Sequence, residues 1–365
     1  MSTPIVSIPF MQLRPGEDSA AIDAAIRRVI DRGWFILGPE VEAFEREFAA
    51  ASGAAHAVGV GNGTDAIALI LRALGIGPGD EVVTTPLSAA YTALAILMVG
   101  ARPVFADIDP IRFTMDPAAA EAAITSRTRA ILPVHLYGQP ADLDALEVVA
   151  NRHGLALVED CCQAHLATHR GRPVGSVGIA GAFSFYPTKN LGALGDAGAI
   201  VTRDGALAAR LRRLRNGGQT DRYHHQEPGI NSRLDDMQAA ILLARLPFLA
   251  AWTARRRALA ARYRQQLVGA SVTPPVECDP GHVYHLFVIR SAERDRLQAY
   301  LAACGIEALI HYPVPIPNQP ALAALQPAEC PVTTRACREV LSLPLSPALA
   351  EAQVDAVVYA LRAFA

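Results

Sequence analysis

A single lysine, Lys189, lies between a short apolar segment and a loop with three glycines, over residues 182–198. Ser184 precedes it by five residues, and the chain has no other lysine, because arginine supplies the rest of its positively charged side chains. An amine buried at the mouth of a glycine-rich loop can form a Schiff base with a carbonyl cofactor. A solvated surface lysine is the ordinary alternative, and the neighbouring residues favour the chemical role.

A carboxylate stands at the end of a second apolar segment, residues 155–160. Apolar residues followed by Glu159 and Asp160 predict a buried parallel strand that ends in an acid. Ligands of α/β sheets bind at the carboxyl ends of strands, where a carboxylate can keep the ring nitrogen of pyridoxal phosphate protonated. The alternative is an acid that caps the next helix. An acid-ended strand followed by a lysine-bearing loop favours the cofactor.

A third segment, Gly61-Asn62-Gly63-Thr64, precedes apolar residues at the helical positions 67, 70, 71 and 74. We expect Thr64 or Asp65 to be the N-cap of this helix. Glycines let the backbone approach a ligand, and the exposed amides of a helix start bind phosphate. The segment fits neither a Walker loop nor a dinucleotide fingerprint, and alone it is also compatible with a plain turn.

Strands and helices alternate along residues 54–202, and these elements must position the three segments. We predict strands at 81–85, 104–107, 129–134, 156–160, 182–185 and 199–202. Helical patterns lie between several of them, for example over 142–151. Such alternation predicts an α/β fold, with a mostly parallel sheet that is covered on both faces.

The C-terminal third follows a different pattern. A long helical segment over 234–268 leads to a predicted strand at 282–289 and to predicted helices at 293–304 and 350–364. We therefore predict a large cofactor-binding domain over residues 1–250, which includes the N-terminal segment, and a smaller α+β domain over 251–365.

With these elements in place, the chain resembles the nucleotide-sugar aminotransferases of the DegT/DnrJ/StrS type, a branch of the fold-type I pyridoxal-phosphate enzymes. The motifs that carry the resemblance follow one another along nearly the whole chain: residues 33–39, 61–65, 103–109, 133–138, 159–165, 182–198, 231–240 and 341–345. The resemblance implies a fold-type I transferase with pyridoxal 5'-phosphate as its cofactor.

The resemblance also implies a role for each matching residue. Lys189 would hold the cofactor as an internal aldimine and later move a proton between carbon atoms. Asp160 would pair with the ring nitrogen, and Gln163 would contact the phenolic oxygen. Asn231 would reach the phosphate from the neighbouring subunit, which implies a homodimer with shared active sites. The chain's own phosphate contacts would be Gly63, Thr64 and Ser184. The implied substrate contacts are Tyr186, His311 and Tyr312.

Lysine at position 189 separates two reactions of these enzymes, because relatives that remove a sugar hydroxyl carry histidine there. The resemblance therefore implies transamination, with an amino acid as donor, glutamate first. The loop 190–198 is similar to that of 3-keto-sugar enzymes, which favours a dTDP-3-keto-6-deoxyhexose as the acceptor. A 4-keto nucleotide sugar and a keto-cyclitol with glutamine as donor stay open. A regulator without catalysis is disfavoured, because it would be expected to lose Lys189 or Asp160.

Three positions depart from the family pattern in regions expected to shape the sugar pocket. Ala89 stands where many relatives stack an aromatic residue on the cofactor, and Tyr91 is a possible replacement. Residues 316–319 replace the usual His-Leu-Gln, and Thr334 stands where relatives often have glutamate. These changes bear on the substrate more than on the cofactor.

Composition agrees with an enzyme that acts on a small molecule. The 365 residues carry a net charge of −2, so no nucleic-acid partner is implied. Arginine clusters at 210–215 and 255–257 fit solvated helix faces. No signal peptide or membrane span is recognisable, and we expect a cytoplasmic protein. The six cysteines include no Cys-x-x-Cys pair, so no metal site is expected. Cys161 and Cys162 are predicted to be small buried residues.

Overall fold

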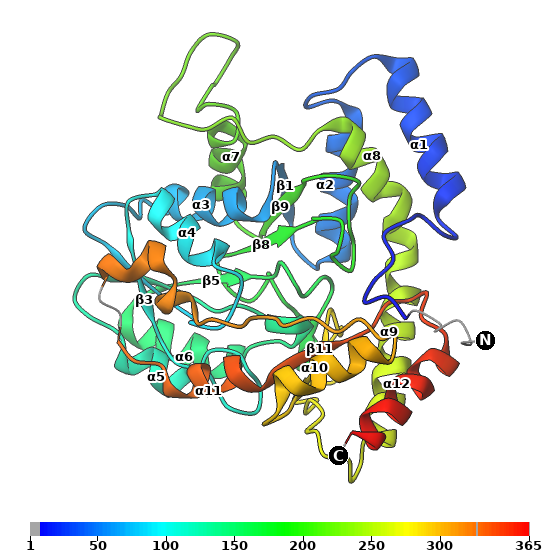
Figure 1. Ribbon diagram of the computed structural model, residues 1–365. Coiled ribbons are helices and arrows are strands. Elements are labelled where there is room, and N and C mark those ends of the chain that lie inside the picture. The colour runs from blue at the N-terminus through cyan, green and yellow to red at the C-terminus, as the bar shows by residue number, and fades with distance from the viewer. Residues whose placement is uncertain (1–7, 326–327, 365) are drawn as a thin grey trace.

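The computed structural model describes residues 8–325 and 328–364 and has a seven-stranded sheet at its centre (Figure 1). The strand order is β1-β9-β8-β5-β4-β2-β3. The bounds are β1 His56–Val60, β2 Glu81–Thr84, β3 Arg102–Phe105, β4 Thr128–Leu132, β5 Ala156–Asp160, β8 Ala180–Ser184 and β9 Gly198–Thr202. Within this described sheet only β9 is antiparallel to its neighbours, which confirms the predicted α/β fold with a mostly parallel sheet.

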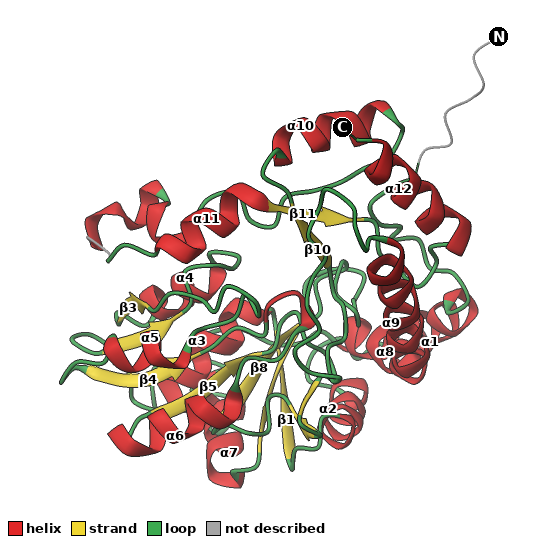
Figure 2. Ribbon diagram, turned by 90° about the horizontal axis from the view of Figure 1, so that it is seen from below, coloured by secondary structure: helices red, strands yellow, loops and turns green. Residues whose placement is uncertain are grey.

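Helices cover both faces of this sheet (Figure 2). Neighbouring strand residues point to opposite faces: Val82 and Val158 pack with α3, α4 and α7, whereas Val83 and Leu157 pack with α2, α5 and α6. Burial on both sides explains why the strands read as continuous apolar runs. The helix bounds are α2 Pro39–Ala51, α3 Gly63–Ala73, α4 Tyr91–Met98, α5 Pro117–Ala122, α6 Leu143–His153 and α7 Gly205–Leu214.

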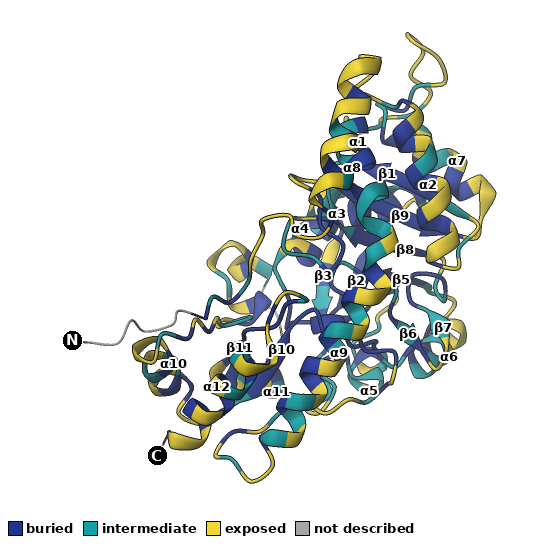
Figure 3. Cartoon of the chain, turned by 90° about the vertical axis from the view of Figure 1, so that its right-hand side faces the viewer, coloured by how far each residue is buried: buried dark blue, intermediate teal, exposed yellow. Residues whose placement is uncertain are grey.

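A separate hydrophobic cluster forms in the C-terminal third, where helices pack on a two-stranded antiparallel sheet. Its elements are α9 Leu249–Gln266, β10 Phe287–Arg290, α10 Arg294–Ala303, β11 Val340–Leu343 and α12 Glu351–Ala363, with α11 Pro331–Glu339 beside β10. The N-terminal segment joins this cluster: the Ile8 N–H donates to the Gly305 carbonyl at 2.8 Å, and the Glu307 N–H donates to the Ile8 carbonyl at 3.0 Å. In Figure 3 the inner strands of the large sheet, such as β5 and β8, are mostly buried, while the outer faces of the helices are exposed.

Two helices from the N-terminal region, α1 (Ser19–Arg32) and α2, pack on α8 (Asp236–Arg245). The Asp236 carboxylate accepts hydrogen bonds from the N–H groups of Gly38 at 2.6 Å and Glu40 at 3.0 Å, and so caps the start of α2. The motif at 231–240 therefore has a structural role in the N-terminal region.

Three predicted elements differ from the structure. The predicted helix 234–268 is divided into α8 and α9 by a short 3-10 turn, Leu246–Phe248, because Pro247 has no N–H donor. Of the predicted strand 282–289, only Phe287 onward is β10, since Tyr284 has a left-handed φ of +47°. The N-cap of α3 is Asn62, whose side chain accepts from the Asp65 N–H at 2.8 Å. The expected caps, Thr64 and Asp65, lie inside the helix.

Two arginines from the clusters that were predicted to be solvated are buried. Arg215 pairs with Glu45 and donates to the Gly59 carbonyl at 2.7 Å. Arg256 donates to backbone carbonyls, among them that of Leu345 at 3.0 Å. Burial of a cation requires such partners, and these come from segments distant in sequence, which helical periodicity cannot reveal.

The predicted domain division at residue 250 falls at the start of α9 and stays a prediction. In the described part of the chain, one helical run, Asp236–Gln266, is long and apolar enough to cross a bilayer by length and composition. This run is α8 together with α9, in which Leu242 and Leu259 are buried in the two hydrophobic clusters. A packed core helix of this length passes the same test, so the run is weak evidence for a membrane.

Candidate active site

The carboxyl ends of β1, β5 and β8 meet at one edge of the sheet, because these strands run in the same direction. Each is followed by or ends in a predicted site residue: Gly63 after β1, Asp160 on β5 and Lys189 after β8. A cavity of about 1090 Å³ lies at this edge, and all three residues line it. The three segments singled out in the sequence therefore form one site, at the edge where α/β sheets bind ligands.

Lys189 is the only lysine in the sequence. It is half-buried in the cavity wall, and its N–H donates to the Tyr186 carbonyl at 2.8 Å. Burial lowers the pKa of its ammonium group, and the nearby Cys162 and Asp160 partly oppose this shift. A lowered pKa favours the neutral amine, which is the form that attacks a carbonyl carbon.

Asp160 is buried at the end of β5 and retains acceptor capacity toward the cavity. Its Oδ2 accepts from the Thr92 hydroxyl at 2.8 Å, and its Oδ1 accepts from the Cys162 N–H at 3.0 Å. A carboxylate can accept about four hydrogen bonds, so about two acceptor positions of Asp160 remain for a ligand. Sequence reasoning missed Thr92, whose only signal was a hydroxyl soon after the strand at 81–85.

The two adjacent cysteines differ in their surroundings. Cys161 is buried, as predicted, whereas Cys162 is half-buried and lines the cavity. Burial raises the pKa of the Cys162 thiol, and the Asp160 carboxylate raises it further. Cys162 is therefore a neutral wall residue, and the prediction of a simply buried residue was wrong for it.

The first turn of α3 forms another part of the cavity wall. The N–H groups of Gly63 and Thr64 belong to this turn, where a helix supplies no carbonyl partner, and both residues line the cavity. A Cβ added to Gly63 would lie 2.8 Å from the Cβ of Ser184 and 2.7 Å from the Sγ of Cys162. Glycine therefore lets the helix start lie against β8, beside the Ser184 hydroxyl.

Ser232 holds the same loop from outside the cavity. The Gly61 N–H donates to its Oγ at 3.0 Å, and this hydroxyl donates to the Asp65 carboxylate at 2.6 Å. The neighbouring Asn231 is exposed and does not line the cavity of its own chain. It pairs with Asn216 at the base of the loop between α7 and α8, and the outer part of this loop projects from the body of the protein in Figure 1.

Gln163 is buried and uses both ends of its amide. Its Oε1 accepts from the Tyr137 N–H at 2.8 Å, and its Nε2 donates to the Tyr312 hydroxyl at 3.0 Å. Gln163 and Tyr312 line the cavity. Burial raises the pKa of Tyr312 to about 12, so its phenol stays protonated. One N–H of the Gln163 amide remains for a ligand.

The other two predicted substrate residues occupy different positions. Tyr186 lines the cavity and is 52% exposed. His311 lies outside the lining, and its Nδ1 contacts the Ser342 hydroxyl at 2.9 Å. Burial lowers the pKa of His311 to about 4, and the charge of Lys189 adds to this shift. Sequence reasoning also missed Asp196, which lines the cavity.

The positions that depart from the family pattern are divided between two cavities. Ala89 and Tyr91 both line the cavity of Lys189. Asn318 and Thr334 instead line a second cavity of about 690 Å³ beside α11. All of these departures were expected to shape the sugar pocket. Among the described residues, however, Asn318 and Thr334 do not line the cavity that contains Lys189.

A buried polar cluster includes the two residues that flank Asp160 in the sequence. Glu159, His135 and Cys161 lie close enough together to hold a metal ion. The Glu159 carboxylate, however, already accepts from His135 Nε2 at 3.0 Å and from three backbone N–H groups. His135 Nδ1 accepts from the Ala141 N–H at 3.0 Å, which places the proton on Nε2. The cluster is thus a satisfied hydrogen-bond network.

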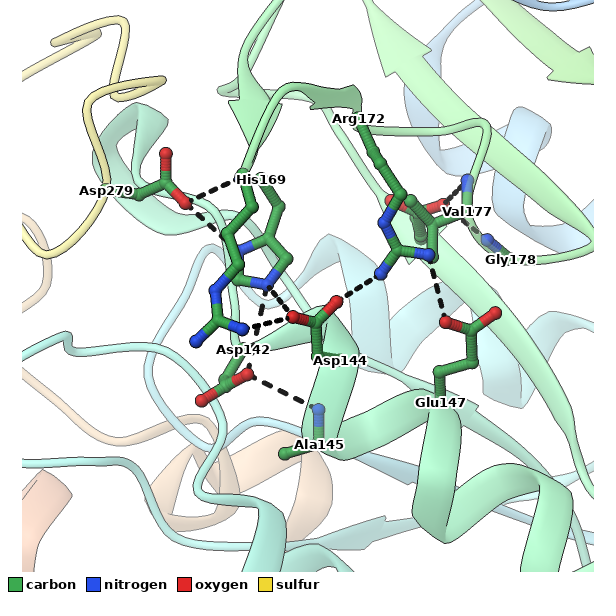
Figure 4. A network of polar contacts seen from close by, with 11 residues as sticks. Asp142, Asp144, Ala145, Glu147, His169, Arg172, Val177, Gly178 and Asp279 are labelled. Carbon is green, nitrogen blue, oxygen red and sulfur yellow. Dashed lines mark hydrogen bonds and ion pairs between the residues drawn. The ribbon is translucent and has the colours of Figure 1, made fainter.

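A second polar network lies beyond this cluster (Figure 4). Buried His169, on the hairpin of β6 (Thr168–His169) and β7 (Arg172–Pro173), lies between Asp144 of α6 at 3.5 Å and Asp279 at 3.2 Å. Arg172 also pairs with Glu147 of α6 at 3.0 Å. The network joins the hairpin to α6 and to the segment that leads into β10.

The chain is similar to known proteins over nearly its whole length. Residues 17–362 match the DegT/DnrJ/EryC1/StrS aminotransferase family. The chain belongs to this family. It is therefore an aminotransferase, and the resemblance inferred from the motifs is confirmed.

Individual relatives match over nearly the whole chain. The dTDP-3-amino-3,4,6-trideoxy-alpha-D-glucose transaminase of Streptomyces venezuelae is 50% identical over 367 residues, which cover 98% of this chain and 96% of the relative. A crystal structure of S. venezuelae DesV in complex with a ketimine intermediate superposes with a TM-score of 0.96, at 50% identity and 98% coverage of both chains. Bacillus subtilis NtdA with bound cofactor PMP gives a TM-score of 0.92 at 32% identity, covering 98% of this chain and 85% of NtdA.

Proposed function

We propose that this aminotransferase uses pyridoxal 5'-phosphate to move an amino group from an amino acid, with glutamate as the favoured donor, to a keto carbon of a nucleotide-linked deoxysugar. The favoured acceptor is a dTDP-3-keto-6-deoxyhexose. The observation that carries the proposal is the meeting of Lys189, Asp160 and the first turn of α3 around one cavity. The S. venezuelae relative, named for a 3-amino dTDP-sugar, supports the choice of C3.

The residues of the cavity fit the cofactor. Gly63 leaves a close approach that a Cβ would fill, next to the Ser184 side chain and at the start of α3, where the N–H groups of Gly63 and Thr64 lie. These groups would hold the phosphate. Asp160 would face the ring nitrogen, and the remaining N–H of Gln163 would face the phenolic oxygen. Pyridoxal phosphate, when bound, supplies a carbonyl for condensation with amines and a ring that delocalises an electron pair.

The chain's own groups then divide the work of the reaction. The Lys189 amine, with its lowered pKa, can accept a proton from a substrate carbon and return it to another. Asp160, buried and with acceptor capacity left, presents fixed negative charge inside the cavity. The protonated Tyr312 phenol, held by Gln163, can donate to an oxygen of the substrate.

The central test is a half-reaction experiment with the purified enzyme. The cofactor's visible absorbance should fall on addition of the amino donor, and it should return only with a suitable keto sugar. Borohydride should attach the cofactor to Lys189, because the sequence has no other lysine. A chain that shows neither the spectral change nor the reducible attachment would not have the proposed function.

The substrate class has a separate test against the keto-cyclitol alternative. A dTDP-linked sugar offers a base and two phosphates for binding, whereas a free keto-cyclitol does not. Micromolar dTDP-sugar should raise the melting temperature, because a ligand that binds only the folded state stabilises it. Protection by a keto-cyclitol alone would overturn the nucleotide-sugar assignment. A UDP-linked or 4-keto sugar that completes the half-reaction faster would change only the specific acceptor.

The shared site of a homodimer is also part of the proposal. Asn231 is exposed at the base of the loop between α7 and α8 and is absent from the lining of its own cavity, as expected of a residue that serves a neighbouring copy. Mixing Lys189→Ala with Asn231→Ala under subunit exchange would place both defects in one site of a heterodimer and none in the other. Activity should then recover to as much as about a quarter of wild type, as random pairing in a two-fold dimer requires. No recovery despite verified exchange would mean that Asn231 does not act across subunits.

A further inference from the structure

Asn190, the residue after Lys189, is buried and uses both ends of its amide. Its Nδ2 donates to the Val283 carbonyl at 3.1 Å, and its Oδ1 contacts Nδ1 of His285 at 3.3 Å. Both partners lie about 95 residues further along the chain, in the segment that leads into β10. The loop that carries Lys189 is thereby attached to another part of the molecule at the position next to the amine.

The conformation of Tyr284 lets Val283 and His285 meet the same amide. Tyr284 has a φ of +47°, which is uncommon for a bulky residue and persists only where the surroundings hold it. The Arg256 guanidinium provides such a hold, since its Nη1 donates to the carbonyls of Tyr284 and His285, each at 3.3 Å. The left-handed turn is thus fixed from the α9 side.

The same segment also contacts the backbone next to Gln163, the residue proposed to face the phenolic oxygen of the cofactor. The Val283 N–H donates to the Gly138 carbonyl at 3.0 Å, and the Leu286 N–H donates to the Tyr137 carbonyl at 3.3 Å. Tyr137 in turn supplies the N–H that orients Gln163. A Cβ on Gly138 would lie 2.9 Å from the His285 nitrogen, so the two backbones are in close contact. Residues 283–286 therefore contact the backbone that supports Gln163 and the loop that supports Lys189.

We propose that Asn190, held by residues 283–285, is a positioning residue that sets the orientation of Lys189 toward the cofactor. Burial lowers the pKa of His285 well below its usual range, so a neutral ring is available to donate from Nδ1 to Asn190. The proposal rests on the function proposed above, because it assigns the purpose of the contact to the lysine–cofactor link. A clamp next to the reacting amine limits its motion, and catalysis depends on such orientation.

The test compares Asn190→Ala with Gln139→Ala in the cofactor-loaded enzyme. Gln139 is a matched control, because it is also a buried amide that clamps the same C-terminal segment from both ends. Its Nε2 donates to the Val276 carbonyl at 3.1 Å, and its Oε1 accepts from the Cys278 N–H at 3.1 Å. It is not adjacent to a cofactor residue. Both variants should lose a similar amount of thermal stability.

The decisive readout is the visible circular dichroism per bound cofactor, which reports a fixed orientation of the lysine-linked ring. Asn190→Ala should reduce it by about twofold or more and should slow the half-reaction about tenfold at saturating donor. Gln139→Ala should leave both at wild-type values. Equal signals in the two variants, whether both normal or both reduced, would overturn the positioning role.

A second variant keeps the test open if Asn190→Ala does not fold. His285→Leu removes the ring contact and leaves Asn190 in place, and it should reduce the same signal in the same direction. A normal signal in His285→Leu would overturn the proposal that residues 283–285 hold Asn190 in the orientation that Lys189 needs. Failure of the proposed function would look different, because the wild-type enzyme itself would then bind no cofactor at Lys189.

Discussion

Glu159 and Asp160 are adjacent carboxylates on β5, both buried, yet they differ in how many hydrogen bonds they accept. Glu159 accepts four hydrogen bonds, from His135 Nε2 and from the N–H groups of Gly175, Val177 and Gly178, at 2.7 to 3.0 Å. Asp160 accepts two and lines the cavity. Successive residues of a strand point to opposite faces, so one step along the chain separates the carboxylate that is used by the fold from the one that is proposed to face the cofactor.

Acceptor capacity, more than burial, therefore distinguishes the structural Glu159 from Asp160, for which we propose a chemical role. A carboxylate with every lone pair in use can only hold the fold together, since a ligand would have to displace existing donors. One with capacity left can receive a proton-bearing ligand atom. Substitutions at Lys189, Glu159 and Asp160 should therefore separate loss of activity from loss of stability.

Lys189→Ala removes the only amine on the cavity side, and activity should fall below detection, by about 10⁴-fold or more. The fold should persist, because the Lys189 side chain has no ion pair among the described residues. Circular dichroism in the far ultraviolet checks the fold, and borohydride trapping checks the cofactor link. With no second lysine in the sequence, a reducible adduct elsewhere in the chain would contradict the assignment.

Glu159→Gln should destabilise the fold without a direct effect on the reaction. The new amide group would face buried N–H donors on one side, and each donor left unsatisfied costs about 1–3 kcal/mol, for a total of about 3 kcal/mol. Urea denaturation measures the loss. Asp160→Asn is the matched control, because it makes the same atomic change one residue away and should cost less than about 1 kcal/mol. Equal losses would contradict the distinction.

Asp160→Asn should slow the half-reaction with glutamate by about two orders of magnitude, which corresponds to about 2.7 kcal/mol at the transition state. The reason is the loss of fixed negative charge opposite the ring nitrogen. Single-turnover absorbance gives the rate. If Asp160→Asn reacts at nearly the wild-type rate while Glu159→Gln, measured where it is folded, is slow, the two roles would have to be exchanged.

The pH dependence of stability should show a smaller effect, which comes from the buried His165. Burial, with a smaller contribution from Lys189, lowers the pKa of His165 to about 3. The unfolded chain takes up a proton near pH 6.5 and the folded chain does not, so stability is complete above that pH and falls as the pH falls. Between pH 7 and 5 this histidine should account for at most about 2 kcal/mol. His165→Gln should flatten the decline, and an unchanged slope would contradict the assignment.

The cofactor side of the site could be predicted from sequence because its signals are local. An apolar run that ends in Asp160 and a glycine-rich loop around Lys189 are readable within a few residues, and strand direction then brings them to one edge. The missed features depend on partners far along the chain. Thr92 reaches Asp160 across 68 residues, and Arg256 is buried because it donates to carbonyls near β10. Periodicity at 282–289 resembled a strand, since a left-handed Tyr284 leaves no trace in composition.

The pairing of Ile8 with Gly305 and Glu307 has a consequence for biosynthesis. During translation Ile8 leaves the ribosome before its partners, which are synthesised about 300 residues later. At roughly 5–20 residues per second this delay is about 15–60 s. Throughout that time Ile8 lacks both of its backbone hydrogen-bond partners. Phe10 of the same segment packs with Leu87 and Val134, which are synthesised much earlier. The backbone pairing of Ile8 therefore forms only after residues 305–307 have been synthesised.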